Sequence, residues 1–160
     1  VACAVMPVGS AQAAVEGADV VLTATNSNVP VFDGAWLAPG THVTSIMGGN
    51  VGLVKAGIAA AKRRELDDTT VQRSDVIVVN SLEQAIQDEQ GDLYDPVQAG
   101  VLTWEKVGEL GALLNGQTAG RTRAGEITLF KNNAGQGIAD VAIATLVFKL
   151  AREKGLGIEF

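Results

Sequence analysis

Short apolar runs alternate with longer segments of mixed polarity along the whole chain. An apolar run opens the sequence at residues 2–8, and others follow at residues 20–25, 42–47, 75–79 and 127–130. Glycine, proline, asparagine or serine lies within two residues of each later run, which is typical of strands covered on both faces in a parallel sheet. We therefore predict a strand at each of these segments.

The segments between the runs carry helix signals. Ser10 can cap a helix through Glu16, because its hydroxyl can accept a free backbone N–H. Ser81 followed by Gln84 forms a capping box for a helix that reaches about Glu89. Further helical segments are expected at residues 35–37, 51–64, 67–73, 105–114 and 138–154.

Four stretches qualify this pattern. Residues 138–154 form the longest predicted helix and are apolar nearly all round, which indicates that this helix is buried. Glycine and proline predict a break at residues 90–92, a loop around residues 95–96 and a polar turn at residues 131–137.

The alternation of strands and helices predicts an α/β fold, a Rossmann-like, mainly parallel sheet with flanking helices. A complete dinucleotide-binding domain also needs a Gly-rich turn after its first strand, to seat a pyrophosphate on a helix N-terminus. No G-x-G-x-x-G occurs near the start of this chain. Either the domain is of another kind, or the chain is its second half.

Composition excludes several classes of protein. The 160 residues are 47% hydrophobic and 19% charged, which rules out a disordered chain. The net charge of -6, with only 12 lysines and arginines, disfavours a nucleic-acid partner. The sequence contains no charge-free apolar window of about 20 residues, so we predict no membrane span. We expect a cytoplasmic protein with no membrane partner.

The cysteine and histidine content limits the chemistry. Cys3 is the single cysteine, so no intrachain disulfide can form, and its apolar surroundings favour a small core residue over a reactive thiol. The lone His42 has no recognisable metal-ligand spacing to Cys3, so no metal site is expected.

Polar loops follow two of the predicted strands. Residues 23–28 follow Val20-Val21-Leu22, the apolar part of the run at 20–25, and Gly48, Gly49 and Asn50 follow the run at 42–47. In parallel sheets ligands bind outside the carboxyl ends of the strands. The site is therefore expected where these two loops meet.

The chain resembles the ornithine cyclodeaminase/mu-crystallin family along essentially its whole length. Any one matching segment is weak evidence, but together they occur in collinear order. They are Gly17-Ala18-Asp19-Val20-Val21, Thr25-Asn26-Ser27, Pro30-Val31, Trp36-Leu37, Pro39-Gly40-Thr41-His42, Met47-Gly48-Gly49-Asn50, Arg64-Glu65-Leu66-Asp67, Asp75-Val76-Ile77-Val78-Val79, Gln90-Gly91-Asp92-Leu93, Gly120-Arg121, Glu126-Ile127-Thr128-Leu129-Phe130-Lys131 and Ile138-Ala139-Asp140-Val141.

The resemblance implies that these residues are the C-terminal portion of a longer protein. Residues 1–135 would form the later part of a Rossmann-like NAD(P)-binding domain. Residues 136–160 would form a helix that packs back toward an N-terminal substrate and dimerisation domain. That domain and the Gly-rich turn would both lie upstream, and the protein would be a homodimer.

The resemblance also implies a chemistry. Family members bind NAD or NADP and exchange hydride with the carbon that bears an amine or imine. They act as deaminating dehydrogenases, cyclodeaminases or ketimine reductases on amino acids or cyclic imines. The alternative is a dinucleotide-dependent small-molecule binding protein of the mu-crystallin type with little turnover.

Eight residues would contact the cofactor by this resemblance, although the loop residues could also be plain polar turns. Asparagine stands at position 132, where the family has serine after the lysine. The residues are Thr25, Asn26, Ser27, Met47, Gly48, Gly49, Lys131 and Asn132.

Asn50 is the catalytic candidate, and Asn50 and Glu89 are the substrate-binding candidates. The cyclodeaminases have aspartate at the position of Asn50. An amide cannot act as a general base near neutral pH but can hydrogen-bond a substrate amine, imine or carboxylate. Ornithine cyclisation is therefore less favoured than the other activities. The simpler interpretations are a helix cap for Asn50 and an exposed acid for Glu89.

Overall fold

The described part of the chain is built on a parallel sheet. The computed structural model describes residues 3–133 and 137–158. Neighbouring strands pair in the order β1-β2-β5-β3-β4, and every pair is parallel. The strands are β1 (Val20–Thr23), β2 (His42–Ser45), β3 (Val76–Val79), β4 (Val107–Glu109) and β5 (Thr128–Lys131). The predicted α/β, Rossmann-like parallel sheet is confirmed.

The strand register brings the carboxyl ends of four strands together. Thr23 at the end of β1 pairs with Ser45 at the end of β2, and Ser45 pairs with Lys131 at the end of β5. Lys131 in turn pairs with Val79 of β3. Each strand is followed at this edge by a loop, so polar side chains far apart in sequence meet there.

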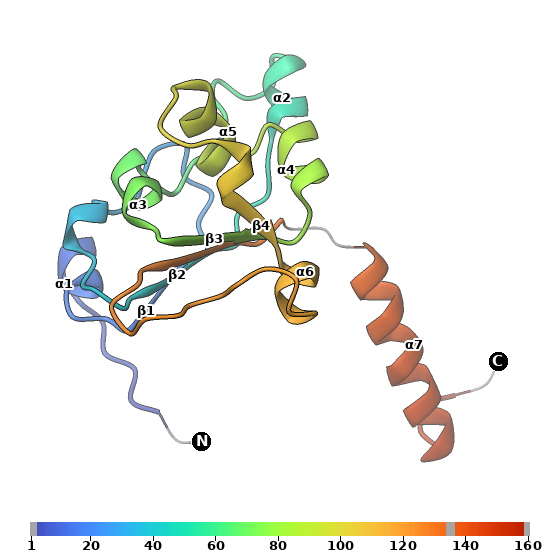
Figure 1. The fold of residues 1–160 in the computed structure, drawn as a ribbon. Helices are drawn as coiled ribbons and strands as arrows, with labels where there is room; N and C mark the ends of the chain where they lie inside the picture. Colours follow the sequence, from blue (N-terminus) through green and yellow to red (C-terminus); the bar gives the residue numbers. More distant parts are fainter. Residues whose placement is uncertain (1–2, 134–136, 159–160) are drawn as a thin grey trace.

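Short helices flank the sheet. Figure 1 shows α2, α3, α4 and α5 on one face and α6 on the other. Between α6 and the sheet lies a cavity lined by Leu113, His42 and Phe130, among others. The helices are α1 (Ala11–Val15), η1 (Gly34–Trp36), α2 (Val51–Lys55), α3 (Asp68–Arg73), α4 (Leu82–Gln87), α5 (Gly91–Gln98), η2 (Trp104–Lys106), α6 (Leu110–Leu114) and α7 (Gly137–Glu153).

Caps define the helix starts that the sequence predicts. The Ser10 side chain accepts a hydrogen bond from the Ala13 N–H, and the Ser81 side chain accepts one from the Gln84 N–H. These bonds satisfy backbone donors that the first helical turn leaves free. The helical turns at residues 35–37 and 67–73 are also present, as η1 and α3.

The core lies between the sheet and the face-covering helices α2, α3, α4 and α5. Alternate residues of the central strands point into it, as a strand's two-residue period requires. Residues from the loops and helices complete it. Its members that are at most 2% exposed are Val43, Val79 and Leu129 from the sheet, and Leu37, Leu66, Val71, Ala85 and Leu93.

The prediction of a strand at residues 2–8 is wrong for the described part, residues 3–8, which form no regular structure. Val5 is 88% exposed and Met6 is 80% exposed, and Cys3 is also exposed rather than part of the core. No described strand of the sheet pairs with this segment. An apolar run without a partner strand cannot satisfy its backbone groups as a strand.

Two helix predictions and one loop prediction need correction. The helix expected at residues 51–64 ends at Lys55, and Gly57 follows with a φ of +70°, which ends a helix readily. The helix expected at residues 105–114 is divided among η2, β4 and α6. The loop expected around residues 95–96 is part of α5, where Pro96 lies inside the helix.

Two burial predictions are not met within the described residues. Strand β1 is covered on one face only, because Val20 and Leu22 are 61% and 59% exposed. Helix α7 forms as predicted but has no buried residue, and Figure 1 shows it projecting away from the sheet. No other described element lies against its apolar surface. The turn at residues 131–137 lies partly outside the described residues.

None of the helices in the described ranges combines the length and the apolar character that a membrane crossing requires.

Candidate functional site

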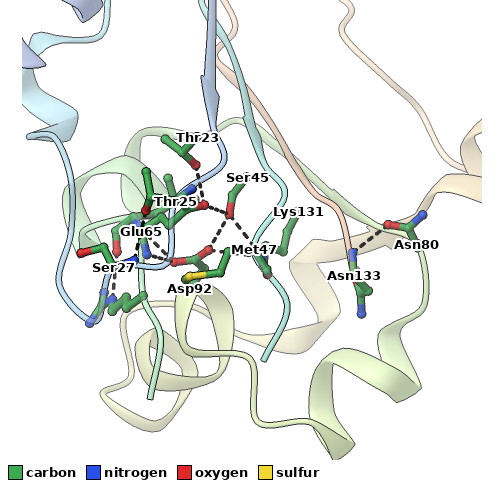
Figure 2. Close-up of polar contacts among 12 residues, drawn as sticks. Thr23, Thr25, Ser27, Ser45, Met47, Glu65, Asn80, Asp92, Lys131 and Asn133 are labelled. Carbon is green, nitrogen blue, oxygen red and sulfur yellow. Dashed lines mark hydrogen bonds and ion pairs between the residues drawn. The ribbon is translucent and has the colours of Figure 1, made fainter. Parts of the chain in front are cut away.

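A buried polar cluster occupies the carboxyl edge of the sheet. It contains Thr23, Ser45 and Lys131, which end β1, β2 and β5, together with Glu65 and Asp92. Figure 2 shows these five side chains converging, with dashed lines joining them into one network. All five are at most 5% exposed. Below, this set is called the edge network.

Glu65 joins the strand ends of β1 and β2. Its Oε2 accepts from the Thr23 hydroxyl at 2.8 Å, and the Ser45 hydroxyl lies 3.0 Å from the same oxygen. Its Oε1 accepts from the Thr25 backbone N–H at 2.5 Å. Burial raises the pKa of Glu65, but hydrogen bonds from Thr25, Thr23 and Ser45 outweigh burial and place the pKa below its ordinary value.

Asp92 stands at the start of α5 and holds the segment that carries Glu65. Its Oδ1 accepts from the backbone N–H groups of Glu65 and Leu66 at 2.7 and 2.9 Å. Its Oδ2 accepts from the Ser45 hydroxyl at 2.7 Å and lies 3.4 Å from the Lys131 ammonium nitrogen. Asp92 therefore links β2, β5, α5 and the segment before α3.

Lys131 is the buried cation of the edge network, with a side chain that is 1% exposed. Its ammonium donates to the Ser45 hydroxyl at 3.2 Å and to the Met47 carbonyl. Burial lowers the pKa of Lys131 below its ordinary value, even though Asp92 and then Glu65 favour the charged form. Lys131 thus holds the loop after β2 by a hydrogen bond from the buried side of that loop.

The residues expected to contact a cofactor surround this network. Thr25 and Asn26 are exposed and Ser27 is half-buried in the loop after β1. In the loop after β2, Met47 is buried and Gly49 is exposed. Gly48 lies between them, and Asn132 follows β5 with its N–H donated to the Ser45 carbonyl at 2.8 Å. The structure therefore brings all eight residues to one edge.

Asn50 uses both ends of its amide within the chain. Its Nδ2 donates to the Ala61 carbonyl at 3.0 Å, and its Oδ1 accepts from the Arg63 N–H at 2.7 Å. It occupies the N-cap position of α2 without a side-chain capping bond. Asn50 thus secures the segment that leads to Glu65.

Glu89 lies among surface lysines. Its carboxylate is 2.7 Å from the Lys55 ammonium and 3.8 Å from that of Lys62. Lys62 also pairs with Asp95 and lies 4.9 Å from the centre of the Tyr94 ring. Hydrogen bonding to Lys55 lowers the pKa of Glu89. The contacts of Glu89 are those of a surface ion pair.

Gln90 is the unusual polar residue of this edge. It is 1% exposed, yet neither its Nε2 nor its Oε1 has a hydrogen-bond partner among the described residues. Its neighbours in a small cleft include Met47, Gly48 and Gly49. A buried amide without partners is costly, and the cleft beside it has no room for even a water molecule, so a ligand would reach Gln90 only if the adjoining loop moved.

Two glycines lie where the loops pack closely behind this cleft. A Cβ added at Gly91 would lie 2.5 Å from the Arg63 carbonyl oxygen. One added at Gly49 would lie 3.0 Å from the Asp88 carbonyl oxygen. Small residues thus let the backbone of three segments approach each other at the carboxyl edge.

Sequence reasoning did not single out Ser45, Glu65, Asp92 or Gln90 as site residues. Glu65, Asp92 and Gln90 lie in the two segments Arg64–Asp67 and Gln90–Leu93 that carry the family resemblance. The sequence did offer one signal for them: these segments match the family and contain acidic residues that have no evident role at the surface. No group of three or more metal-ligating side chains is arranged to hold a metal ion within residues 3–133 and 137–158.

Known proteins share this architecture. The Thermococcus litoralis Δ1-pyrroline-2-carboxylate reductase, solved in complex with NADH and L-proline, is 35% identical with a TM-score of 0.81, over 96% of this chain and 44% of that one. A probable ornithine cyclodeaminase from Bordetella pertussis is 31% identical with a TM-score of 0.75, over 94% of this chain and 45% of that one.

A curated relative gives the same result. The Δ1-pyrroline-2-carboxylate reductase of Bacillus cereus is 34% identical over 150 residues, which are 92% of this chain and 42% of the relative. The chain therefore spans about two fifths of the length of the relatives it matches. A sequence model of the ornithine cyclodeaminase/mu-crystallin family matches residues 2–155, so the chain belongs to that family.

Proposed function

We propose that the protein containing this chain is an NAD(P)-dependent oxidoreductase that acts on the amine or imine carbon of an amino acid or cyclic imine. The observation that carries the proposal is the pair of loops at the carboxyl ends of the adjacent parallel strands β1 and β2. They present small polar residues and glycines at the edge where open parallel sheets bind ligands. A relative with the same fold binds NADH and L-proline.

The two loops would hold the nicotinamide half of the dinucleotide. Thr25, Asn26 and Ser27 offer hydroxyl, amide and backbone groups on one side. Gly48 and Gly49 let the backbone approach a flat ring on the other, and Gln90 lies buried behind them. When bound, the cofactor supplies hydride exchange at nicotinamide C4, while the protein orients the partners and excludes water.

Asn50 would lie next to the substrate, and Glu89 stays a weaker substrate-binding candidate. The Asn50 amide is engaged with Ala61 and Arg63, so a substrate contact would require it to exchange one of these bonds. Lys131 is buried beneath the loop after β2, so it would act on the cofactor through Met47. Asn132 would contact the cofactor from the end of β5.

The remaining parts of the site would lie in the portion of the protein that corresponds to the uncovered length of the relatives. We place there the Gly-rich phosphate turn, the substrate domain and the homodimer contacts, in a cytoplasmic enzyme. Helix α7 would then cover its apolar residues, such as Val147 and Phe148, against that domain.

The test uses the complete natural gene product. NADH and NADPH are titrated while nicotinamide fluorescence is followed, and Δ1-pyrroline-2-carboxylate and L-amino acids are assayed for turnover. Saturable binding with turnover is expected. Binding without turnover on any of these substrates would favour the mu-crystallin type of binding protein, and no binding would refute both.

Asn50 is tested in the same assays. Asn50→Asp and Asn50→Ala are expected to change the KM for the imine more than the Kd for NADH. Asn26→Ala is the matched control on the opposite loop. It is expected to change the Kd for NADH more than the KM for the imine. Unchanged substrate kinetics in both Asn50 variants would remove Asn50 from the site.

A further inference from the structure

The edge network gives each cofactor loop one buried anchor. The loop after β1 is held by Glu65, which accepts from the Thr25 backbone N–H and from the Thr23 hydroxyl. The loop after β2 is held by Lys131, whose ammonium donates to the Met47 carbonyl. Both anchors reach their loop from elements that are distant in sequence.

The two anchors share one support. The Ser45 hydroxyl oxygen lies 3.0 Å from Glu65 Oε2, 2.7 Å from Asp92 Oδ2 and 3.2 Å from Lys131 Nζ. Because a hydroxyl has one proton, Ser45 can donate to only one carboxylate at a time while it accepts from the ammonium. Displacing any one partner therefore changes what Ser45 can offer the others.

The anchors are too deeply buried to touch a ligand themselves. Glu65 is fully buried, and Lys131 and Asp92 are each 1% exposed. Buried ionic groups are a poor way to gain stability, since well-packed apolar residues often do as well or better. A network of charges at this position is better explained by the geometry that it imposes on the loops.

We propose that Glu65 and Lys131 are positioning residues of the dinucleotide site, each setting the backbone of one loop, with Ser45 coupling the two. The inference rests on the proposed function for the identity of the ligand. The anchoring of the loops is independent of that ligand. Because Glu65 and Lys131 do not touch the ligand, a search for residues in contact with the cofactor would miss this role.

The experiment compares Lys131→Met, Glu65→Gln and Ser45→Ala in the complete gene product. Amide hydrogen exchange is measured without cofactor, and the NADH Kd is measured by fluorescence. We expect Lys131→Met to speed exchange mainly at residues 47–50 and Glu65→Gln mainly at residues 25–28, whereas Ser45→Ala affects both. Each loss of a charged hydrogen bond should weaken NADH binding roughly tenfold.

Val71→Ala is the matched control, because Val71 is 1% exposed in the core of α3 but is not a member of the edge network. It should lower Tm while leaving loop exchange and NADH affinity unchanged. Equal loop exchange in wild type and Lys131→Met, or the same loosening in Val71→Ala, would overturn the proposal. Loop-specific exchange without dinucleotide binding by the wild type would instead refute the proposed function and leave the anchoring intact.

Discussion

Two glutamates at opposite ends of the sheet show how the same side chain can do different work. Glu65 lies at the carboxyl ends of the strands, and Glu126 lies just before β5, near the amino ends. Both are buried, at 0% and 8% exposure, and hydrogen bonds lower the pKa of both. Their partners differ in distance along the chain.

Glu126 is satisfied locally. It accepts from the backbone N–H groups of Thr122 and Arg123 at 2.7 and 3.2 Å, and its other oxygen pairs with the Arg123 side chain at 2.9 Å. These donors are three or four residues away. Such a turn can form within a short segment and holds that segment alone.

Glu65 is satisfied only in the assembled sheet. Its partners Thr23, Thr25 and Ser45 are 42, 40 and 20 residues away. Each bond therefore fixes one part of the fold relative to another, at the edge where the loops face solvent. The comparison teaches that long-range polar contacts, more than pKa shifts, distinguish the candidate site from a stable turn.

The largest expected effect comes from breaking the edge network at Asp92. Asp92→Ala leaves the Lys131 ammonium buried without its carboxylate and two backbone N–H groups without an acceptor. Breaking a buried pair in this way costs about 3–5 kcal/mol of unfolding free energy. That is a large fraction of the total for a domain, about 5–15 kcal/mol. Urea unfolding measures it.

Asp95→Ala is the control from the same helix. Asp95 pairs with Lys62, and their side chains are 33% and 25% exposed. A surface pair contributes about 0–1 kcal/mol. Equal losses of stability for the two alanine variants would show that the edge network is no more important than a surface ion pair.

Sequence patterns predicted the parts of the fold that are decided locally. The caps at Ser10 and Ser81 are read from a serine and the backbone donor three residues on, and the structure has both bonds. The strands β2 and β3 were readable as apolar runs. Strand β4 was not, because Val107, Gly108 and Glu109 form no apolar run, and only pairing with β3 makes them a strand.

Long-range packing decides the rest. Helix α5 was missed because Pro96 suggests a loop, but the burial of Leu93 and the hydrogen bonds of Asp92 to Ser45, Glu65 and Leu66 outweigh the cost of the proline. The two loops of the candidate site were predicted from their place after strands. The edge network beneath them was not, since the bonds of Asp92 to Ser45 and Glu65 span 47 and 27 residues.

Acid should separate the two glutamates in a second prediction. A glutamate whose pKa is lowered in the folded state stabilises the protein at any pH above its ordinary pKa of 4.5. This stabilisation is lost as pH falls through the folded-state pKa, which is about 2 for Glu126. Glu126→Gln should lower Tm slightly near neutral pH and flatten its fall between about pH 4.5 and pH 2.

Glu65→Gln should also flatten the acid dependence of Tm, but with a loss of about 2 kcal/mol near neutral pH, since it removes hydrogen bonds to a buried charge. Thermal unfolding from pH 7 downward provides both curves. Only Glu65→Gln should also weaken NADH binding at pH 7. The comparison fails if Glu126→Gln weakens NADH binding as much as Glu65→Gln does.

The smallest expected change sharpens the comparison at Gln90. Its buried amide has no partner among the described residues, so Gln90→Met, which keeps the shape and removes both polar atoms, should be neutral or slightly stabilising. The same substitution should weaken NADH binding if the amide serves the ligand. If Gln90→Met is more stable but binds NADH more weakly, the wild-type glutamine lowers stability in order to serve the ligand. Unchanged binding would show that the cleft beside Gly48 and Gly49 is packing alone.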